Sequence, residues 1–236
     1  RNYKYIPALD SLQISRDHAY VHITSNNTIY GTQWHEFPDT EGVPLIADMS
    51  SDILSRPFDV SKFGLIYAGA QKNLGPAGVT VVIIRRDLLT NVPEQLPTML
   101  KYKTHIDSNS LYNTPPTTSI YVLSKVLDWV DSRGGLEAIA EHNRAKAELL
   151  YDAIDTSDGF YQGHADPEAR SLMNVTFTLA DKDLEAKFLA EAKAAGFVGI
   201  NGHRSVGGCR ASIYNAVPIE AVEALRDFML DFRAKN

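Results

Sequence analysis

One stretch of the sequence decides the fold: residues 63–84 read FGLIYAGAQKNLGPAGVTVVII. Its two ends, residues 63–68 and 79–84, are continuous apolar runs rich in β-branched and aromatic residues, which are typical of strands buried on both faces of a sheet. Between them, residues 69–78 contain too much Gly and Pro to form a regular helix or strand. The stretch therefore predicts two buried strands joined by a loop, and that loop carries Lys72.

Further strands and helices are predicted on both sides of this stretch. Upstream, the alternating segment 19–24 and the short apolar run 44–47 are predicted strands. Downstream, apolar residues recur at helical spacing from 120 to 130 until Gly134 and Gly135 end the helix, and a second, long helix follows. The last third predicts the order β-α-β-β-α, with strands at 173–179, 197–200 and 210–214 and helices at 181–195 and from Pro218 to about Ala234.

Length, charge and composition narrow the class of protein. The 236 residues suffice for one large or two modest domains, and we place a boundary near residue 142, between a larger domain, 1–142, and a small α+β domain, 143–236. A net charge of −6 argues against a nucleic-acid partner, which selects for a basic surface. The single cysteine, Cys209, excludes an internal disulfide framework and fits a reducing compartment such as the cytoplasm. No apolar run reaches the ~18 residues that a membrane-spanning helix needs.

Lys72 and Asp48 are the first candidates for chemistry. A lysine amine beside a buried strand, in surroundings of low dielectric, can lose its proton and form a Schiff base with an aldehyde, whereas the alternative is an ordinary solvated lysine. Asp48 ends another apolar run and lies 24 positions before Lys72. A lysine for the imine and an aspartate that keeps a pyridine nitrogen protonated are the pair that pyridoxal phosphate (PLP) needs. The alternative for Asp48 is the cap of a helix that begins at Met49.

A phosphate group needs hydroxyl, amide and backbone N–H groups, and two polar segments offer them. Thr28 follows the turn of residues 25–27, and Asn113 with Thr114 precedes two prolines. Each segment is also typical of a plain turn, which remains the alternative.

A third cluster combines cations with glycine. Residues 201–212 read NGHRSVGGCRAS, so His203, Arg204 and Arg210 surround a glycine-rich turn. Guanidinium groups bind carboxylates and phosphates well, and surface ion pairs are the alternative. The cluster does not match the loop of an NTPase, and no G-x-G-x-x-G of a dehydrogenase follows a strand. No His or Cys pair has zinc spacing, so we expect no metal, and Cys209 is more typical of a packed thiol than of a nucleophile.

Taken together, these stretches resemble the phosphoserine aminotransferases, a family of PLP enzymes of fold type I. The likeness runs from about residue 3 to 234, and the segment Gly-Ala-Gln-Lys-Asn-x-Gly-Pro-Ala-Gly around Lys72 is specific to the family. It implies an α/β chain that forms part of the mixed sheet of the large domain, with helices, and a C-terminal α+β small domain. Chains of the family are longer at the N-terminus by roughly a third, so this sequence resembles their C-terminal part. The likeness is carried by residues 47–89, 112–117, 134–139 and 201–216 and by the final helix.

The resemblance also implies a role for each candidate residue. Lys72 would hold PLP as a Schiff base and act as the catalytic base, and Asp48 would pair with the pyridine nitrogen. Thr28 and Gln71 would line the cofactor. Asn113 and Thr114 would reach the cofactor phosphate of the neighbouring subunit in a homodimer with shared sites. Arg210 would bind the α-carboxylate of the substrate. His203 and Arg204 would bind the phosphate of the substrate.

The implied reaction is a transamination between glutamate and 3-phosphohydroxypyruvate, giving 2-oxoglutarate and O-phosphoserine for serine biosynthesis. A phosphorylated hydroxythreonine of pyridoxine biosynthesis is a second implied substrate, and the implied location is the cytoplasm. One alternative is another PLP enzyme of fold type I, such as an alanine–glyoxylate aminotransferase or a cysteine desulfurase, but His203, Arg204 and the segment YNTPPT at 112–117 speak against it. The other alternative is an inactive fragment that serves only as a binding or dimerisation module.

Overall fold

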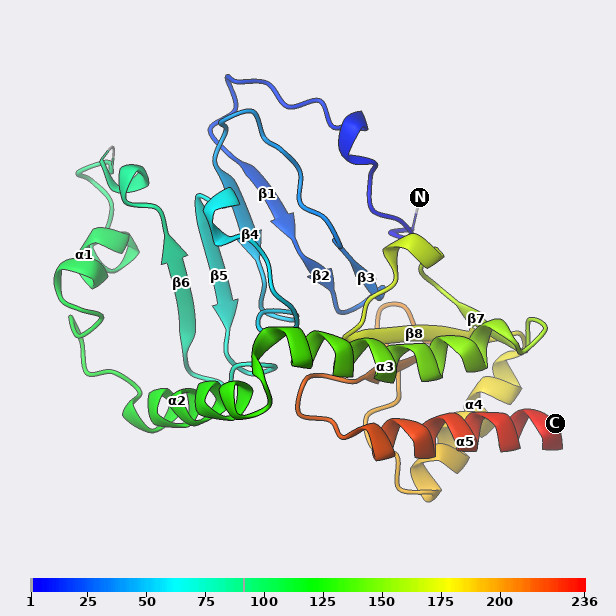
Figure 1. Ribbon diagram of the computed structural model, residues 1–236. Coiled ribbons are helices and arrows are strands. Elements are labelled where there is room, and N and C mark those ends of the chain that lie inside the picture. Colours follow the sequence, from blue (N-terminus) through cyan, green and yellow to red (C-terminus); the bar gives the residue numbers. More distant parts are fainter. Residues whose placement is uncertain (1, 91) are drawn as a thin grey trace.

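A four-stranded sheet forms the first half of the computed structural model, which describes residues 2–90 and 92–236. The strands lie in the order β1 (Val21–Thr24), β4 (Leu45–Asp48), β5 (Leu65–Gly69) and β6 (Thr80–Ile84), as Figure 1 shows. β1, β4 and β5 are parallel, and β6 runs antiparallel to β5. These strands confirm the ones predicted from 19–24, 44–47, 63–68 and 79–84.

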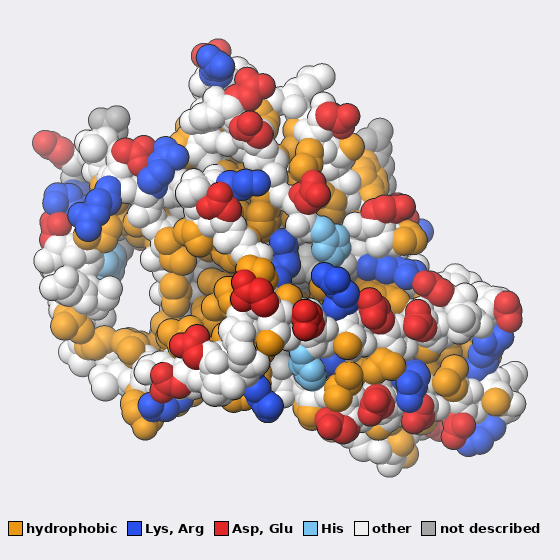
Figure 2. Space-filling model, viewed as in Figure 1, with side chains coloured by type: hydrophobic (Ala, Val, Ile, Leu, Met, Phe, Trp, Pro, Cys, Tyr) orange, Lys and Arg blue, Asp and Glu red, His pale blue; other side chains and the backbone are white. Residues whose placement is uncertain are grey.

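The runs 63–68 and 79–84 were both predicted to be buried on both faces of the sheet, and the structure differs from this prediction for the second run. β5 is buried, with Ile66 and Ala68 almost inaccessible in a core that also contains Leu45 and Ala47. β6 is not buried on both faces, because Val82 and Ile83, which point to opposite sides of the sheet, are 37% and 42% exposed. Figure 2 shows hydrophobic side chains gathered over this part of the surface. The apolar run of β6 is therefore left uncovered by the described residues.

Helices connect this sheet to a second one. A short helix α1 (Tyr102–Asp107) precedes α2 (Thr117–Ser132), and α3 (Gly135–Asp155) follows at once. Gly134 and Gly135 have φ of 98° and 80°, a left-handed backbone that ends α2 where the sequence predicted. α3 then runs beneath the first sheet and along the second (Figure 1). Short 3-10 helices lie at Leu9–Ser11, Val60–Lys62, Arg86–Leu89, Thr98–Leu100 and Pro167–Ala169.

The second sheet is antiparallel and has the order β7 (Tyr161–Gly163), β8 (Asn174–Leu179) and β9 (Cys209–Ser212). α3, α4 (Lys182–Ala194) and α5 (Ile219–Lys235) pack with it around a core that includes Phe177, Phe188 and Phe232. The sequence prediction missed the short strand β7. A strand predicted at 197–200 is wrong, because Gly199 has a φ of 80° and only an isolated bridge, Asn201 to Cys209, forms there.

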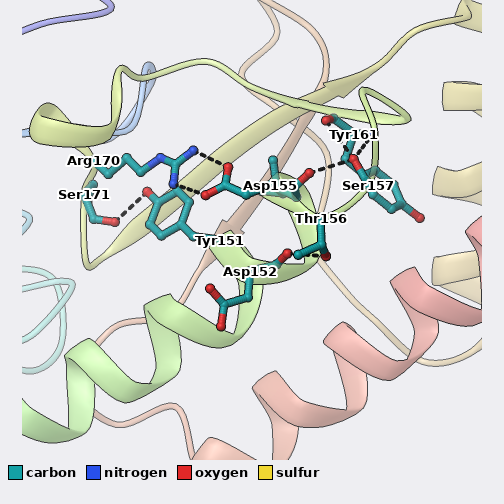
Figure 3. A network of polar contacts seen from close by, with 9 residues as sticks. Tyr151, Asp152, Asp155, Thr156, Ser157, Tyr161, Arg170 and Ser171 are labelled. Atoms are coloured by element: carbon teal, nitrogen blue, oxygen red, sulfur yellow. Dashed lines mark hydrogen bonds and ion pairs between the residues drawn. The ribbon is translucent and has the colours of Figure 1, made fainter.

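A polar network ties the C-terminal end of α3 to the segment before β8 (Figure 3). Arg170 donates to both carboxylate oxygens of Asp155 at 2.7 and 2.6 Å, and its guanidinium lies over the Tyr151 ring, 4.5 Å from the centroid. The Tyr151 hydroxyl donates to the backbone carbonyl of Ser171 at 2.8 Å. These contacts orient α3 relative to β8, which lies next to the strand of Arg210.

Among residues 2–90 and 92–236, no helix has the length and apolarity to cross a bilayer. In the same residues, no group of three His, Cys, Asp or Glu side chains is placed to hold a metal ion.

Candidate active site

The parallel strands end at one edge of the first sheet, and polar residues follow each of them. β1, β4 and β5 end at Thr24, Asp48 and Gly69, and the register pairs Thr24 with Asp48. In open α/β sheets, ligands bind in the crevice outside the carboxyl ends of the strands. The loops that begin here carry Thr28 and Lys72, so the strands bring these sequence-distant residues to one place.

Lys72 lies in the loop between β5 and β6 and reaches across to the loop after β1. Its Nζ donates to Thr28 Oγ1 at 2.9 Å. The Thr28 segment is more ordered than the predicted turn, because Asn26–Asn27 (β2) pairs with Thr32–Gln33 (β3) as a small hairpin. Lys72 is half-buried and has a defined partner, so the alternative of a free solvated lysine does not describe it.

Arg210 approaches the same threonine from the second sheet. It lies on β9, and its Nη1 donates to the backbone carbonyl of Thr28 at 3.4 Å. Its Nε is buried and has no hydrogen-bond partner among the described residues. Thr28 therefore meets both Lys72 and Arg210, and the guanidinium keeps a donor free for a carboxylate, which it binds through paired N–H groups.

Asp48 occupies the end of β4. One carboxylate oxygen accepts a hydrogen bond from the backbone N–H of Ser50 at 2.9 Å, and a turn follows. The alternative interpretation, the cap of a helix that begins at Met49, is wrong, because no helix begins there. Burial and the negative charge of Asp48 raise the pKa of Tyr67, which lies opposite Asp48 on β5. Asp48 thus supplies negative charge at the edge of the first sheet where the loops of Thr28 and Lys72 begin.

A buried carboxylate that the sequence prediction missed lies behind Asp48. Asp52 is only 7% exposed and accepts hydrogen bonds from the Ser25 hydroxyl and from Gln33 Nε2. Burial raises the pKa of Asp52 to about 6, against the opposing effect of these hydrogen bonds. No spacing or motif in the sequence distinguishes it from a surface aspartate of a turn.

Gln71 lies at the rim of this cluster. It is exposed, and its amide group lies against Gly69, where an added Cβ would meet Gln71 Oε1 at 2.6 Å. A side chain larger than hydrogen at Gly69 would therefore displace Gln71 from the entrance of the loop that carries Lys72.

Four other predicted site residues make only local contacts among the hydrogen bonds of the described residues. Asn113 and Thr114 are exposed in the segment between α1 and α2, where Asn113 Nδ2 donates to the carbonyl of Thr114. His203 and Arg204 lie in the loop before β9, and His203 Nδ1 contacts the Ser205 hydroxyl at 2.7 Å. Within the described residues, no hydrogen bond or ion pair connects these four to Lys72.

The chain matches the aminotransferase class-V family over residues 4–225 and belongs to that family. It is 70% identical over 234 residues to the phosphoserine aminotransferase of Lysinibacillus sphaericus (strain C3-41), and 68% identical over 234 residues to that of Geobacillus kaustophilus (strain HTA426). In both comparisons the match covers 99% of this chain and 65% of the relative.

Solved structures agree with the sequence comparison. The phosphoserine aminotransferase from Bacillus circulans subsp. alkalophilus superposes with a TM-score of 0.97 at 58% identity, covering 99% of this chain and 65% of that chain. The α/β fold that the resemblance implied is therefore confirmed. The chain spans about 65% of the length of the relatives it matches.

Proposed function

We propose that the protein is a phosphoserine aminotransferase, which uses PLP to transfer an amino group between glutamate and 3-phosphohydroxypyruvate. The observation that carries the proposal is the meeting of Lys72 and Arg210 at Thr28. A reaction on an amino or keto acid requires a primary amine that can act as a base. It also requires a cation that binds the carboxylate, and the guanidinium has an unpartnered donor for this purpose. The 58–70% identity to proteins named phosphoserine aminotransferase supports the same substrate class.

The chemistry of the residues present fits PLP. Lys72 would hold the cofactor covalently, Asp48 would pair with the ring nitrogen, and Thr28 and Gln71 would lie along the ring. The buried, unpartnered Nε of Arg210 fits an anionic group bound beside Lys72. When bound, PLP supplies the electron sink that stabilises negative charge on the substrate Cα.

The residues of this chain then bind the substrate, orient it and move a proton. Arg210 holds the α-carboxylate with two N–H groups, which fixes the direction of the Cα–H bond. The Lys72 amine takes the proton from Cα and later returns a proton, because it is the basic group within reach of that position. Thr28 accepts a hydrogen bond from Lys72 and so keeps the amine beside the residue whose carbonyl Arg210 also contacts.

The proposal also gives roles in substrate choice and in subunit assembly to the predicted site residues that make no contact with Lys72. His203 and Arg204 would bind the phosphate of the substrate, and Asn113 and Thr114 would contact the cofactor phosphate of a second subunit in a cytoplasmic homodimer. Asn113 and Thr114 are exposed in this chain, which is compatible with a contact across a subunit boundary, whereas Arg204 is exposed and His203 half-buried. The larger domain would comprise residues 1–142 and the small domain 143–236. A phosphorylated hydroxythreonine fits the same phosphate group as a second substrate.

Two alternative functions remain to be tested against this proposal. Another PLP enzyme of fold type I would act on keto acids without a phosphate and would gain nothing from His203 and Arg204. An inactive binding module would not react with PLP at Lys72.

The experiment compares substrates in the full natural protein. We expect kcat/KM for 3-phosphohydroxypyruvate to exceed that for its unphosphorylated counterpart by about 100-fold, because two charge-assisted hydrogen bonds to phosphate are lost in the counterpart. The variant Arg204→Ala should reduce this preference about tenfold, and Arg226→Ala, at a partly exposed arginine on α5, is the matched control. Equal rates for the two keto acids would refute the proposal.

A further inference from the structure

Asn73 follows Lys72 in the chain and joins the two halves of the site. Its side chain is only 5% exposed. Its Nδ2 donates to the carbonyl of Ile53, in the turn after β4, at 3.0 Å. Its Oδ1 accepts from the backbone N–H of Asn215 at 3.0 Å. Asn215 lies in the loop after β9, the strand that carries Arg210. We call this contact the Asn73–Asn215 link.

A buried lysine of α3 holds the loop that contains Asn215. Lys146 on α3 is fully buried, and burial lowers its pKa to about 8. Its amine has three donors when protonated, and the structure gives each donor a backbone carbonyl. The acceptors are Ile213 at 2.9 Å, Tyr214 at 2.8 Å and Val217 at 3.1 Å. The backbone on both sides of Asn215 is therefore pinned to α3.

The side chain of Asn215 fastens the same loop to the first half of the molecule. Asn215 Nδ2 donates to the carbonyl of Leu54 at 2.8 Å, and its Oδ1 accepts from Asn143 Nδ2 at 2.8 Å. Asn143, one turn before Lys146 on α3, also donates to the carbonyl of Ser55 at 3.1 Å. The loop thus has fixed contacts on the first sheet, on α3 and on Asn73.

A buried amide that satisfies both its donor and its acceptor holds its backbone in one place, because any shift leaves a polar group without a partner. The backbone of Lys72 is covalently joined to that of Asn73. Lys72 has a long, flexible side chain, so its reach toward Thr28 depends on where its backbone is placed. The Asn73–Asn215 link is therefore a short physical connection between the segment of Arg210 and the backbone of Lys72.

We propose that Asn73 is a positioning residue for Lys72: the Asn73–Asn215 link sets the Lys72 amine at the distance from Arg210 that the reaction needs. The inference rests on the proposed function, in which Lys72 binds the cofactor. The inference attributes the placement of the Lys72 amine to the hydrogen bond that Asn73 Oδ1 accepts, and not to general packing. Another side chain with an acceptor oxygen at position 73 should therefore keep the Lys72 amine in place.

The test measures how fast Lys72 of the full natural protein reacts with added PLP, followed by absorbance, and identifies the labelled peptide after borohydride reduction by mass spectrometry. We expect Asn73→Ala to slow labelling of Lys72 about tenfold. Asn73→Asp keeps an oxygen for the Asn215 N–H, so it should stay within about threefold of the unchanged protein, although a buried carboxylate lowers stability more. If Asn73→Ala does not fold, Asn73→Ser takes its place, because its hydroxyl is too short to reach the Asn215 N–H, and it should slow labelling in the same way.

The matched control is Ser157→Ala, a buried polar residue that loses its hydrogen bonds to Ile154 and Tyr161, none of which involves Asn73 or Asn215. Urea unfolding should show a loss of stability for Ser157→Ala, while labelling of Lys72 stays unchanged. Equal slowing in Ser157→Ala, or equal slowing in Asn73→Asp and Asn73→Ala, would overturn the positioning role. An unlabelled Lys72 in the unchanged protein would overturn the proposed function itself, whereas a labelled one with no effect of Asn73→Ala would overturn only the link.

Discussion

Thr28 performs two separate tasks with two different atoms. Its hydroxyl accepts from Lys72, and its backbone carbonyl accepts from Arg210. Thr28→Val keeps the shape of the side chain and the carbonyl but removes the hydroxyl. We therefore expect kcat to fall about tenfold while KM for the keto acid stays within about twofold, in steady-state kinetics of the full natural protein. A rise in KM with unchanged kcat would show that the hydroxyl serves binding instead.

Asp52 predicts a pH dependence of stability. Its pKa in the folded protein is about 6, against 3.8 as the ordinary value, so the folded state keeps a proton that the unfolded state has released. Stability from this group therefore falls as the pH rises from 4 to 6, by about 3 kcal/mol. Urea unfolding at pH 4 and pH 7 should show this slope and its loss in Asp52→Asn. The exposed control Asp128→Asn should keep the slope, and an unchanged slope in Asp52→Asn would contradict the prediction.

Single residues also show what a sequence can and cannot predict about a site. Lys72 and Asp48 could be found, because each ends or follows an apolar run and their residue types have a chemical use together. Asn73, Asn143 and Lys146 could not, because their importance comes from burial against segments 67 to 142 positions away. An asparagine or lysine in a helix or loop carries no sign of such a partner.

At the scale of elements, α3 carries a second pH effect through Lys146. Burial lowers its pKa from 10.5 to about 8, so between these values the unfolded state binds a proton that the folded state has lost. The contribution of Lys146 to stability therefore rises as the pH rises from 8 to 10.5, by about 3 kcal/mol. Denaturant unfolding at pH 8 and pH 10 should show the unchanged protein gaining stability relative to Lys146→Met. A constant difference between the two proteins would refute this.

The ends of helices lie where the sequence predicted them when a glycine or proline restricts the backbone. Gly134 and Gly135 end α2, and Pro218 precedes α5, as their backbone preferences require. The strand predicted at 197–200 failed because the pattern of apolar residues ignored the left-handed backbone at Gly199. β7 was missed because a strand of three residues is too short to show alternation.

For the whole molecule, the exposed apolar surface predicts association. Ile83, Leu100 and Tyr121 are 42%, 68% and 62% exposed, and they lie on three different segments. Large apolar side chains left exposed are typical of surfaces that contact other proteins. We expect the 236-residue chain on its own to bind a hydrophobic dye and to sediment as species larger than 26.1 kDa at micromolar concentration. A stable monomer without dye binding would contradict this expectation, and the full-length relative from Geobacillus kaustophilus is the control.

The continuity of α3 has a consequence for how the protein can change in evolution. Its 21 residues bond to Ser55 near one end and pack in the second core near the other. One inserted residue would turn everything beyond it by about 100° and shift it by about 1.5 Å. Such a change would carry Ala147 and Leu150 out of the core or Asn143 away from Ser55. We therefore expect insertions and deletions among relatives to fall in the loops around residues 109–116, and to be absent between Gly135 and Asp155.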